Sequence, residues 1–182
     1  MVPIAAAKAS KTVENLKFAF AGESQARNKY DYFAKAARNE DRGAIALIFE
    51  ETAGNEMQHA KEEFKRLHGI GGTAENLKAA IEGEHYETNQ MYPSFAKQAL
   101  ADGDGDAANL FTQLAKVEAV HEARYKKILK RLEEGTLYKR EKPIYWKCTK
   151  CGFVHHGAEA PEKCPSCGHP QGYYWPLDAS DL

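Results

Sequence analysis

The sequence predicts a mainly α protein, with a bundle of four long helices followed by a small metal-binding domain. Residues 11–135 are rich in Ala, Glu, Lys and Leu, and their apolar residues recur with helical spacing. From Thr136 onward the composition shifts to cysteine, glycine, proline and aromatic residues, and all four cysteines lie in this part. We therefore expect two domains, at residues 1–138 and 139–182.

The overall composition narrows the class of protein. Of the 182 residues 43% are hydrophobic and 28% are charged, which are ordinary values for a soluble globular protein. A formal net charge of -1 argues against nucleic acid or an anionic membrane as a partner. No apolar run approaches the roughly 20 residues that a membrane-spanning helix needs, and MVPIAAAKAS, with its early Pro3, is a poor secretory signal. We expect a cytoplasmic protein.

Stop signals divide the helical region into four segments. Asn39–Gly43 ends the first, the glycine-rich stretch His68–Thr73 ends the second, and Gly135 ends the fourth. Asp102–Asp106 ends the third and offers Asp106 as a cap for the fourth. Helices of about 25–30 residues span roughly 40 Å, and the short connections between them favour a four-helix bundle.

Each predicted helix interrupts its apolar stripe with an acid or a histidine near its middle. In chain order the four helices carry Glu23, then Glu56-x-x-His59, then Glu84, then Glu118-x-x-His121. The glutamate and the following pair are separated by 33 residues in the first half and by 34 in the second, so the bundle consists of two similar helix pairs. Carboxylates in an apolar core need compensating positive charge, and no Lys or Arg occupies the matching positions.

Metal ions would supply this charge, and carboxylates with imidazoles are a ligand set suited to iron or manganese. A single Glu-x-x-His pair is usually solvated, but two pairs with matched glutamates form the arrangement found in dinuclear carboxylate bundles. In this interpretation Glu56 and Glu118 bridge two ions, Glu23 and Glu84 are terminal ligands, and each histidine serves one ion.

The third helix carries additional polar residues near this level. Glu87 follows Glu84 by one turn and is either solvated or a ligand that exchanges when the metal changes oxidation state. Tyr30 and Tyr92 lie about two turns from the lone glutamates and are either hydrogen-bond donors to ligand carboxylates or ordinary core aromatics. Pro93 removes one helical N–H and predicts a bend.

The cysteines form two pairs separated by twelve residues, Cys148-x-x-Cys151 and Cys164-x-x-Cys167. This spacing predicts one tetrahedral metal site, and Gly152 and Gly168 would let both loops turn tightly. The spacing alone fits structural zinc and redox iron equally well, but a dinuclear iron centre that consumes an oxidant needs a one-electron donor, which favours iron.

Other residues of this small domain have simpler expected roles. We expect a small aromatic core built from Tyr145, Trp146, Phe153, Tyr173, Tyr174 and Trp175. Three histidines are expected at the surface rather than on the metal, because four thiolates already complete the shell: His155, His156 and His169.

Six stretches of the sequence together resemble the rubrerythrin family over residues 11–176. They are FAFAGESQARNKY, ETAGNEMQHAKEEF, GEHYETNQMYPSF, EAVHEARY, WKCTKCGFVHHG and APEKCPSCGHP. The resemblance implies a ferritin-like four-helix bundle with a non-haem di-iron site and a rubredoxin-like domain with one iron bound by four cysteines. The implied activity is reduction of hydrogen peroxide to water in oxidative-stress defence, with electrons from NAD(P)H through a reductase or redox donor protein.

The resemblance also implies roles for single residues. It makes Glu23, Glu56, Glu84, Glu118 and His121 di-iron ligands, and it makes Glu87 and His59 an exchanging pair, with Glu87 on the iron when oxidised and His59 when reduced. It places Tyr30 and Tyr92 as hydrogen-bonding neighbours, and it implies a head-to-tail homodimer.

Two other functions remain open at this point. One is iron oxidation and storage in a ferritin-like shell, although storage needs no cysteine-bound electron donor. The other is an interaction module with a structural zinc ribbon, in which any metal in the bundle is incidental. The red colour of iron bound by four cysteines would distinguish this last case from colourless zinc.

Overall fold

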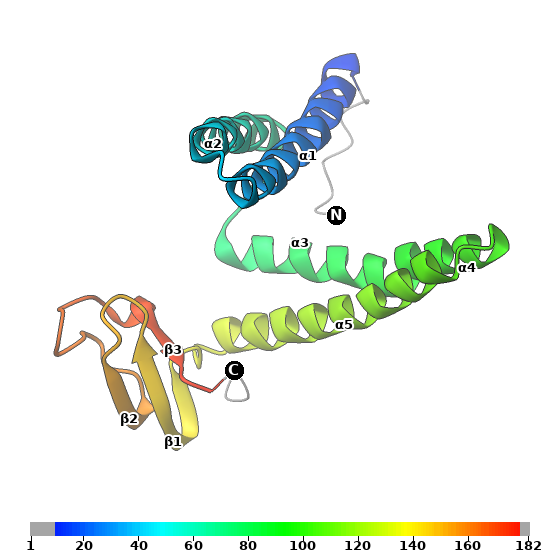
Figure 1. The fold of residues 1–182 in the computed structure, drawn as a ribbon. Coiled ribbons are helices and arrows are strands. Elements are labelled where there is room, and N and C mark those ends of the chain that lie inside the picture. Colours follow the sequence, from blue (N-terminus) through cyan, green and yellow to red (C-terminus); the bar gives the residue numbers. More distant parts are fainter. Residues whose placement is uncertain (1–9, 179–182) are drawn as a thin grey trace. The chain divides into compact units, whose positions relative to one another are not determined.

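The structure, a computed structural model, describes residues 10–178 and divides the chain into two compact units (Figure 1). The first unit ends at Gly72 and the second begins at Thr73. Each unit has its own internal packing. The prediction about a secretory signal falls on residues 1–9, which lie outside the described residues.

The first unit is a hairpin of two long helices, α1 (Lys11–Asn39) and α2 (Gly43–Arg66). Both predicted ends are confirmed. Bidentate hydrogen bonds from Arg38 to Glu50, with distances down to 2.7 Å, join the two helices near the turn. Small buried residues allow the helices to approach closely; they are Ala34, Ala37, Ala46, Ala53 and Ala60.

The second unit begins with a long helical path that is not uniform. It runs through α3 (Thr73–Tyr86), a π-helical segment η1 (Glu87–Met91) and α4 (Tyr92–Ala101), and α5 (Gly105–Glu133) packs against all three. The predicted disturbance at Pro93 takes the form of this π-helical segment. Pro93 itself lies in the first turn of α4, where a missing N–H is best tolerated.

The cap of α5 differs from the prediction. The side chain of Asp104 accepts a hydrogen bond of 2.9 Å from the backbone N–H of Ala107, so Asp104 is the N-cap. Asp106 lies inside the first turn of the helix and was the wrong choice. Both residues are aspartates that directly follow a glycine, and the sequence pattern alone did not distinguish between them.

The two helical hairpins repeat the same packing of three aromatic rings. In the first, the rings of Phe33 and Phe49 lie 5.6 Å apart at 65°, and Tyr30 stacks on Phe49 at 6.1 Å. In the second, two phenylalanine rings again lie 5.6 Å apart, at 63°, and the tyrosine again stacks at 6.1 Å. The members of this second triplet are Tyr92, Phe95 and Phe111. The internal repeat inferred from the acidic residues therefore extends to the packing around them.

The C-terminal part of the second unit is a three-stranded antiparallel sheet with strand order β2-β1-β3. The strands are β1 (Lys139–Cys148), β2 (Val154–Glu159) and β3 (Tyr174–Pro176), and a short 3-10 turn (Gln171–Tyr173) precedes β3. The chain becomes extended at Lys139, shortly after the change of composition at Thr136. Together with the helices, this small sheet confirms the predicted mainly α architecture.

The core of this small domain contains only part of the predicted aromatic set. Trp146 and Tyr174 are buried with Cys148, Cys164 and Ala160, and Phe153 packs against them. Three predicted core residues lie at the surface instead, namely Tyr145, Tyr173 and Trp175. Alternation along the strands explains the outcome for β1 and β3, since neighbouring residues point to opposite faces of a sheet.

Among the helices that the structure describes, none is long and apolar enough to cross a membrane.

Candidate metal centres

One group of candidate ligands lies on the first hairpin. Glu23 comes from α1, Glu56 and His59 come from α2, and the ligand atoms of all three lie within 4.8 Å of one another. Glu56 and His59 are one helical turn apart, and Glu56 Oε2 lies 2.7 Å from His59 Nδ1. The same nitrogen lies 4.0 Å from Glu23 Oε1. Two adjacent helices thus bring two carboxylates and one imidazole to a single point.

The second hairpin carries an equivalent group. Glu84 comes from α3, Glu118 and His121 come from α5, and their ligand atoms also lie within 4.8 Å of one another. Glu118 Oε2 is 2.7 Å from His121 Nδ1, and Glu84 Oε2 is 3.5 Å from the same nitrogen. The residues expected from the repeated sequence pattern are therefore brought together within each hairpin.

The electrostatics of both groups favour a bound cation. The pKa of Glu23 is raised, first by the hydrogen bond shared with Glu56 and then by burial. The pKa of Glu84 is raised, first by burial and then by its hydrogen bond with Glu118. Within residues 10–178 the ion pairs of these four glutamates involve histidine alone.

One atom of the second group shows the lack of positive charge most directly. Glu84 Oε2 is buried and makes no hydrogen bond to any described residue. Its 3.5 Å approach to His121 Nδ1 lacks hydrogen-bond geometry. A buried carboxylate oxygen without a hydrogen bond is costly, and a metal ion would compensate it. Carboxylate oxygens and imidazole nitrogens at this separation therefore fit iron as a ligand set.

Glu87, the additional carboxylate, is the first residue of the π-helical segment. It is not part of the three-residue group around Glu84. After burial, however, the charge of Glu87 is the largest influence that raises the pKa of Tyr92, and it also contributes to the raised pKa of Glu84. Glu87 therefore lies close enough to that group for its charge to affect the pKa of Glu84.

The π-helical segment accommodates one extra residue of the second hairpin. Tyr30 is the seventh residue after Glu23, whereas Tyr92 is the eighth after Glu84. Both tyrosines nevertheless reach the same place in their aromatic triplets, because a π-turn takes up one residue more than an α-turn. Our sequence interpretation missed this segment, and the unequal spacing is the signal that could have revealed it.

Tyr92 lies close enough to Glu87, Glu118 and Glu84 for their charges to act on its hydroxyl, but neither tyrosine hydroxyl bonds to a candidate ligand directly. Among the described residues no hydrogen bond joins Tyr30 or Tyr92 to a carboxylate. Their rings are instead fixed by the aromatic triplets. For Tyr92, burial and then the charges of three nearby glutamates raise the pKa of the hydroxyl, which keeps it protonated and able to donate.

A further buried cluster of the second hairpin was not anticipated. Glu122 is 8% exposed, accepts a hydrogen bond of 2.5 Å from Lys126 and contacts His85 Nδ1 at 3.0 Å. Asn89 contacts the same nitrogen at 3.1 Å. These bonds connect α3 with α5 one residue away from Glu84 and His121. The signal in the sequence was a second acid and a second histidine, each directly following a predicted ligand.

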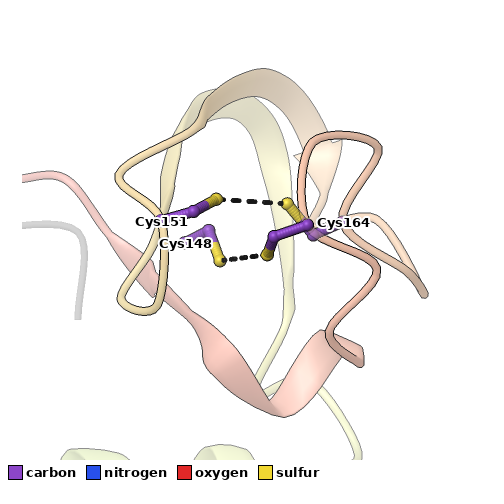
Figure 2. Close-up of side chains that lie close together, drawn as sticks. Cys148, Cys151 and Cys164 are labelled. Carbon is purple, nitrogen blue, oxygen red and sulfur yellow. Dashed lines mark hydrogen bonds between the residues drawn. The ribbon is translucent and has the colours of Figure 1, made fainter.

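The four cysteines meet in the C-terminal domain, where their sulfurs lie within 4.8 Å of one another. Figure 2 shows the sulfurs pointing inward from two loops. The distances are 3.8 Å for Cys148 to Cys167 and 3.7 Å for Cys151 to Cys164. A tetrahedral metal with bonds of about 2.3 Å to sulfur requires edges of about 3.8 Å. The sulfur positions therefore fit one tetrahedral ion.

Both cysteine loops have the tight turns that were predicted. Gly152 and Gly168 have φ angles of +81° and +73°, where glycine is favoured. Their N–H groups each donate a 2.8 Å hydrogen bond to the carbonyl of the first cysteine of the pair. The metal group of the described residues includes none of the three histidines of this domain, His155, His156 and His169.

Burial and hydrogen bonding set the acidity of these thiols. Burial raises the pKa of Cys164, but the nearby Tyr174 hydroxyl and the N–H groups of Cys167 and Ser166 outweigh it and lower the pKa to about 6. The N–H of Phe153 is the main influence that lowers the pKa of Cys151. At Cys167 the backbone N–H of His169 lowers the pKa, but burial and the neighbouring cysteines outweigh it and raise the pKa to about 12. Thiolates are the form that binds metal, so the surroundings favour that form at Cys164 and Cys151 but not at Cys167.

The fold and these groups define a class of protein, namely a metal-binding protein with carboxylate-rich helices and a separate four-cysteine site. The family model for rubrerythrin matches residues 14–129, and the model for the rubrerythrin rubredoxin-like domain matches residues 146–174. The chain therefore belongs to the rubrerythrin family. Its predicted fold class, a ferritin-like helical domain followed by a rubredoxin-like domain, is confirmed.

Individual relatives support this assignment over nearly the whole chain. A putative rubrerythrin of Methanocaldococcus jannaschii is 46% identical, with 90% of this chain and 91% of the relative covered. The rubrerythrin of Porphyromonas gingivalis is 45% identical, with 93% and 92% covered. The rubrerythrin of Clostridium perfringens is also 45% identical, with 92% and 94% covered. Family membership implies an oxidoreductase. The three groups fit the cofactors of this family, two non-haem irons in a di-iron site and one iron bound by four cysteines.

Proposed function

We propose that this protein is a peroxidase that reduces hydrogen peroxide to water at its di-iron site, with electrons supplied through the four-cysteine iron. The overall reaction takes up two electrons and two protons for each peroxide and yields two waters. The observation that carries the proposal is the set of glutamates that face one another without Lys or Arg, repeated on both hairpins. The four-cysteine domain of the same chain supports the electron route.

We assign the di-iron ligands from the two groups described above. Glu56 and Glu118 would be the bridging carboxylates, and each has a histidine one turn later on the same helix. Glu87 is the additional ligand that exchanges with His59 between the oxidised and reduced states. The full proposed set is Glu23, Glu56, His59, Glu84, Glu87, Glu118 and His121. The π-helical segment supports the role of Glu87, because such segments are frequent at functional sites.

When bound, the two irons supply the two electrons that cleave the O–O bond of peroxide. The protein's side chains prepare the site for this chemistry. The glutamates would bind and neutralise the cations, and the aromatic triplets fix the helices that carry these glutamates. The protonated Tyr92 hydroxyl is available to hydrogen-bond to a ligand carboxylate or to peroxide, and we assign the same role to Tyr30.

The remaining partners follow from the electron requirement. A redox donor protein or an NAD(P)H-dependent reductase reduces the four-cysteine iron one electron at a time. We also propose a head-to-tail homodimer, in which the cysteine iron of one subunit serves the di-iron site of the other, and a cytoplasmic location. We also propose that the helical domain ends at residue 138 and that the four-cysteine domain begins at residue 139.

Replacement of one bridging ligand tests this function. The variant Glu118→Gln keeps the size of the side chain but removes its charge, and we expect peroxide turnover to fall by about 100-fold or more. The red absorption of the four-cysteine iron should remain. Steady-state peroxide consumption with an external donor and the iron content of the full-length protein are the measurements.

A matched control lies on the same helix. Glu133 of α5 is half-exposed and forms an ion pair with Lys78 at 3.1 Å, so Glu133→Gln should leave turnover unchanged. Cys164→Ser completes the series, because it should block reduction by the donor while the chemically reduced protein still consumes one equivalent of peroxide. Full turnover in Glu118→Gln would refute the proposed site.

A further inference from the structure

Tyr174 is a buried aromatic residue of the core cluster that contains Cys148 and Cys164. It lies on β3 directly opposite Cys148 on β1, and residues directly opposite in an antiparallel pair have side chains on the same face. It is 3% exposed and belongs to the same core cluster as Cys148 and Cys164. A phenylalanine would fill an apolar core equally well, so the hydroxyl requires an explanation.

The hydroxyl of Tyr174 is buried and makes no hydrogen bond of standard geometry to any described residue. Most buried polar groups have a partner, and an exception calls for one. The buried cluster that contains Tyr174 also contains Cys148 and Cys164, whose sulfurs can accept a hydrogen bond from the hydroxyl. Of these two sulfurs, that of Cys164 is the one with which the hydroxyl interacts most.

We propose that the Tyr174 hydroxyl donates a hydrogen bond to the sulfur of Cys164 in the four-cysteine iron site and thereby raises its reduction potential. A thiolate sulfur bound to iron carries negative charge and can accept such a bond. Reduction adds one electron to the site, so a donor at the sulfur stabilises the reduced state more than the oxidised state. Hydrogen bonds to cysteine sulfurs are a recognised control of iron–sulfur potentials.

This hydrogen bond would act on the proposed electron route. Its effect on peroxide turnover rests on the proposed function, whereas its effect on the reduction potential does not. A higher potential makes it easier for the donor to reduce the four-cysteine iron. The potential itself belongs to the iron site and can be measured without peroxide. Tyr174 acts through Cys164 and is therefore a positioning residue rather than a catalytic one.

The test is a redox titration of the iron-loaded, full-length Tyr174→Phe variant, followed by the red absorption of the four-cysteine iron. We expect the ratio of reduced to oxidised iron at a fixed potential to fall about tenfold, which corresponds to about 59 mV for a one-electron couple. Tyr145→Phe is the matched control, because Tyr145 lies on β1 of the same sheet, is 55% exposed and packs on His156. Its potential should equal that of the unmodified protein.

Equal potentials for Tyr174→Phe and Tyr145→Phe would overturn the inference while leaving the proposed peroxidase intact. A second measurement covers the case in which Tyr174→Phe fails to hold iron. In the unmodified chain loaded with cadmium-113, the hydroxyl proton of Tyr174 should show a scalar coupling to the metal through the sulfur. A hydroxyl proton that shows no coupling would also overturn the inference.

Discussion

The two helical hairpins carry the same ligand group, yet only the second also contains a π-helical segment and a buried acid–histidine pair beside the ligands. Each places a glutamate on one helix opposite a Glu-x-x-His pair on the next, with the bonded carboxylate and imidazole 2.7 Å apart in both. Each also fixes its helices with one tyrosine and two phenylalanines in nearly the same geometry. The common parts are those needed to bind a cation between two helices.

The differences all lie in the second hairpin. One extra residue between Glu84 and Tyr92 is taken up by the π-helical segment, which begins at Glu87. The buried pair of Glu122 and His85 then joins α3 to α5 next to the ligands. In the first hairpin, alanine and serine stand at the corresponding positions, directly after His59 and Glu23. We therefore propose that the repeated parts bind the metal and that the added parts serve the proposed redox chemistry.

Of the changes considered, removal of the extra residue of the second hairpin should lower peroxide turnover most. Deletion of Gln90, an exposed residue of the π-helical segment, restores the seven-residue spacing of the first hairpin. We expect the helix to become regular, and the fold and iron content to be retained. Because Glu87 would be displaced, we expect peroxide turnover to fall by about 100-fold. Circular dichroism, iron analysis and steady-state turnover are the measurements.

The control for this deletion lies in the first hairpin. Lys29 is exposed and also stands between the glutamate and the tyrosine, but in a regular α-helix. Its deletion should rotate the following residues by about 100° and destabilise the hairpin. Normal turnover after deletion of Gln90 would show that the π-helical segment has no role in the reaction.

The tyrosines provide a smaller test of the same comparison. Tyr92 is influenced by the charges of Glu87, Glu118 and Glu84, so we expect Tyr92→Phe to lower turnover about tenfold, as the loss of a hydrogen bond to a metal ligand typically does. Tyr30→Phe, in the hairpin without the extra carboxylate, should have a weaker effect. An equal loss of turnover in the two variants would mean that the tyrosines of both hairpins contribute equally to the reaction, and it would contradict this prediction.

The smallest expected effect concerns the buried pair that joins α3 and α5. Glu122→Gln should lower the free energy of unfolding by about 1 kcal/mol, because the amide can still accept a hydrogen bond but loses its charge. Hydrogen bonds from Lys126 and, after the opposing effect of burial, from His85 lower the pKa of Glu122 below its ordinary value of 4.5.

This pKa shift gives the pH dependence of the same test. The stabilisation is present above pH 4.5 and is lost as the pH falls through the lower pKa of the folded protein. Thermal unfolding of both proteins as a function of pH measures it. A difference between them that persists undiminished well below pH 4.5 would contradict this role of the carboxylate.

Features marked by a repeated or closely spaced sequence motif could be interpreted from the sequence, whereas a contact that no repeated motif marks could not. The helix ends at Asn39 and Gly135, the ligand groups of both hairpins and the four-cysteine cluster all follow from local spacing and composition. The bond between His85 and Glu122 spans 37 residues and depends on how α3 and α5 pack. No single-helix pattern records that packing.

Smaller errors have local causes. Asp104 and Asp106 are chemically alike, and only the backbone conformation at Asp104 makes it the cap of α5. Tyr145 and Tyr174 are the same residue type, and only the pairing of β1 with β3 decides which of them is buried. The π-helical segment was visible only as a difference of one position between two repeats.

The shape of the cysteine cluster has a consequence for how the protein matures in the cell. Both loops are closed by their own backbone hydrogen bonds, and the sulfur spacing suits zinc as well as iron. Zinc is the stronger competitor for such ligands at equal supply. A chain that captured zinc during synthesis would keep its fold but carry no electrons, so the ratio of available iron to zinc would decide how many copies become active.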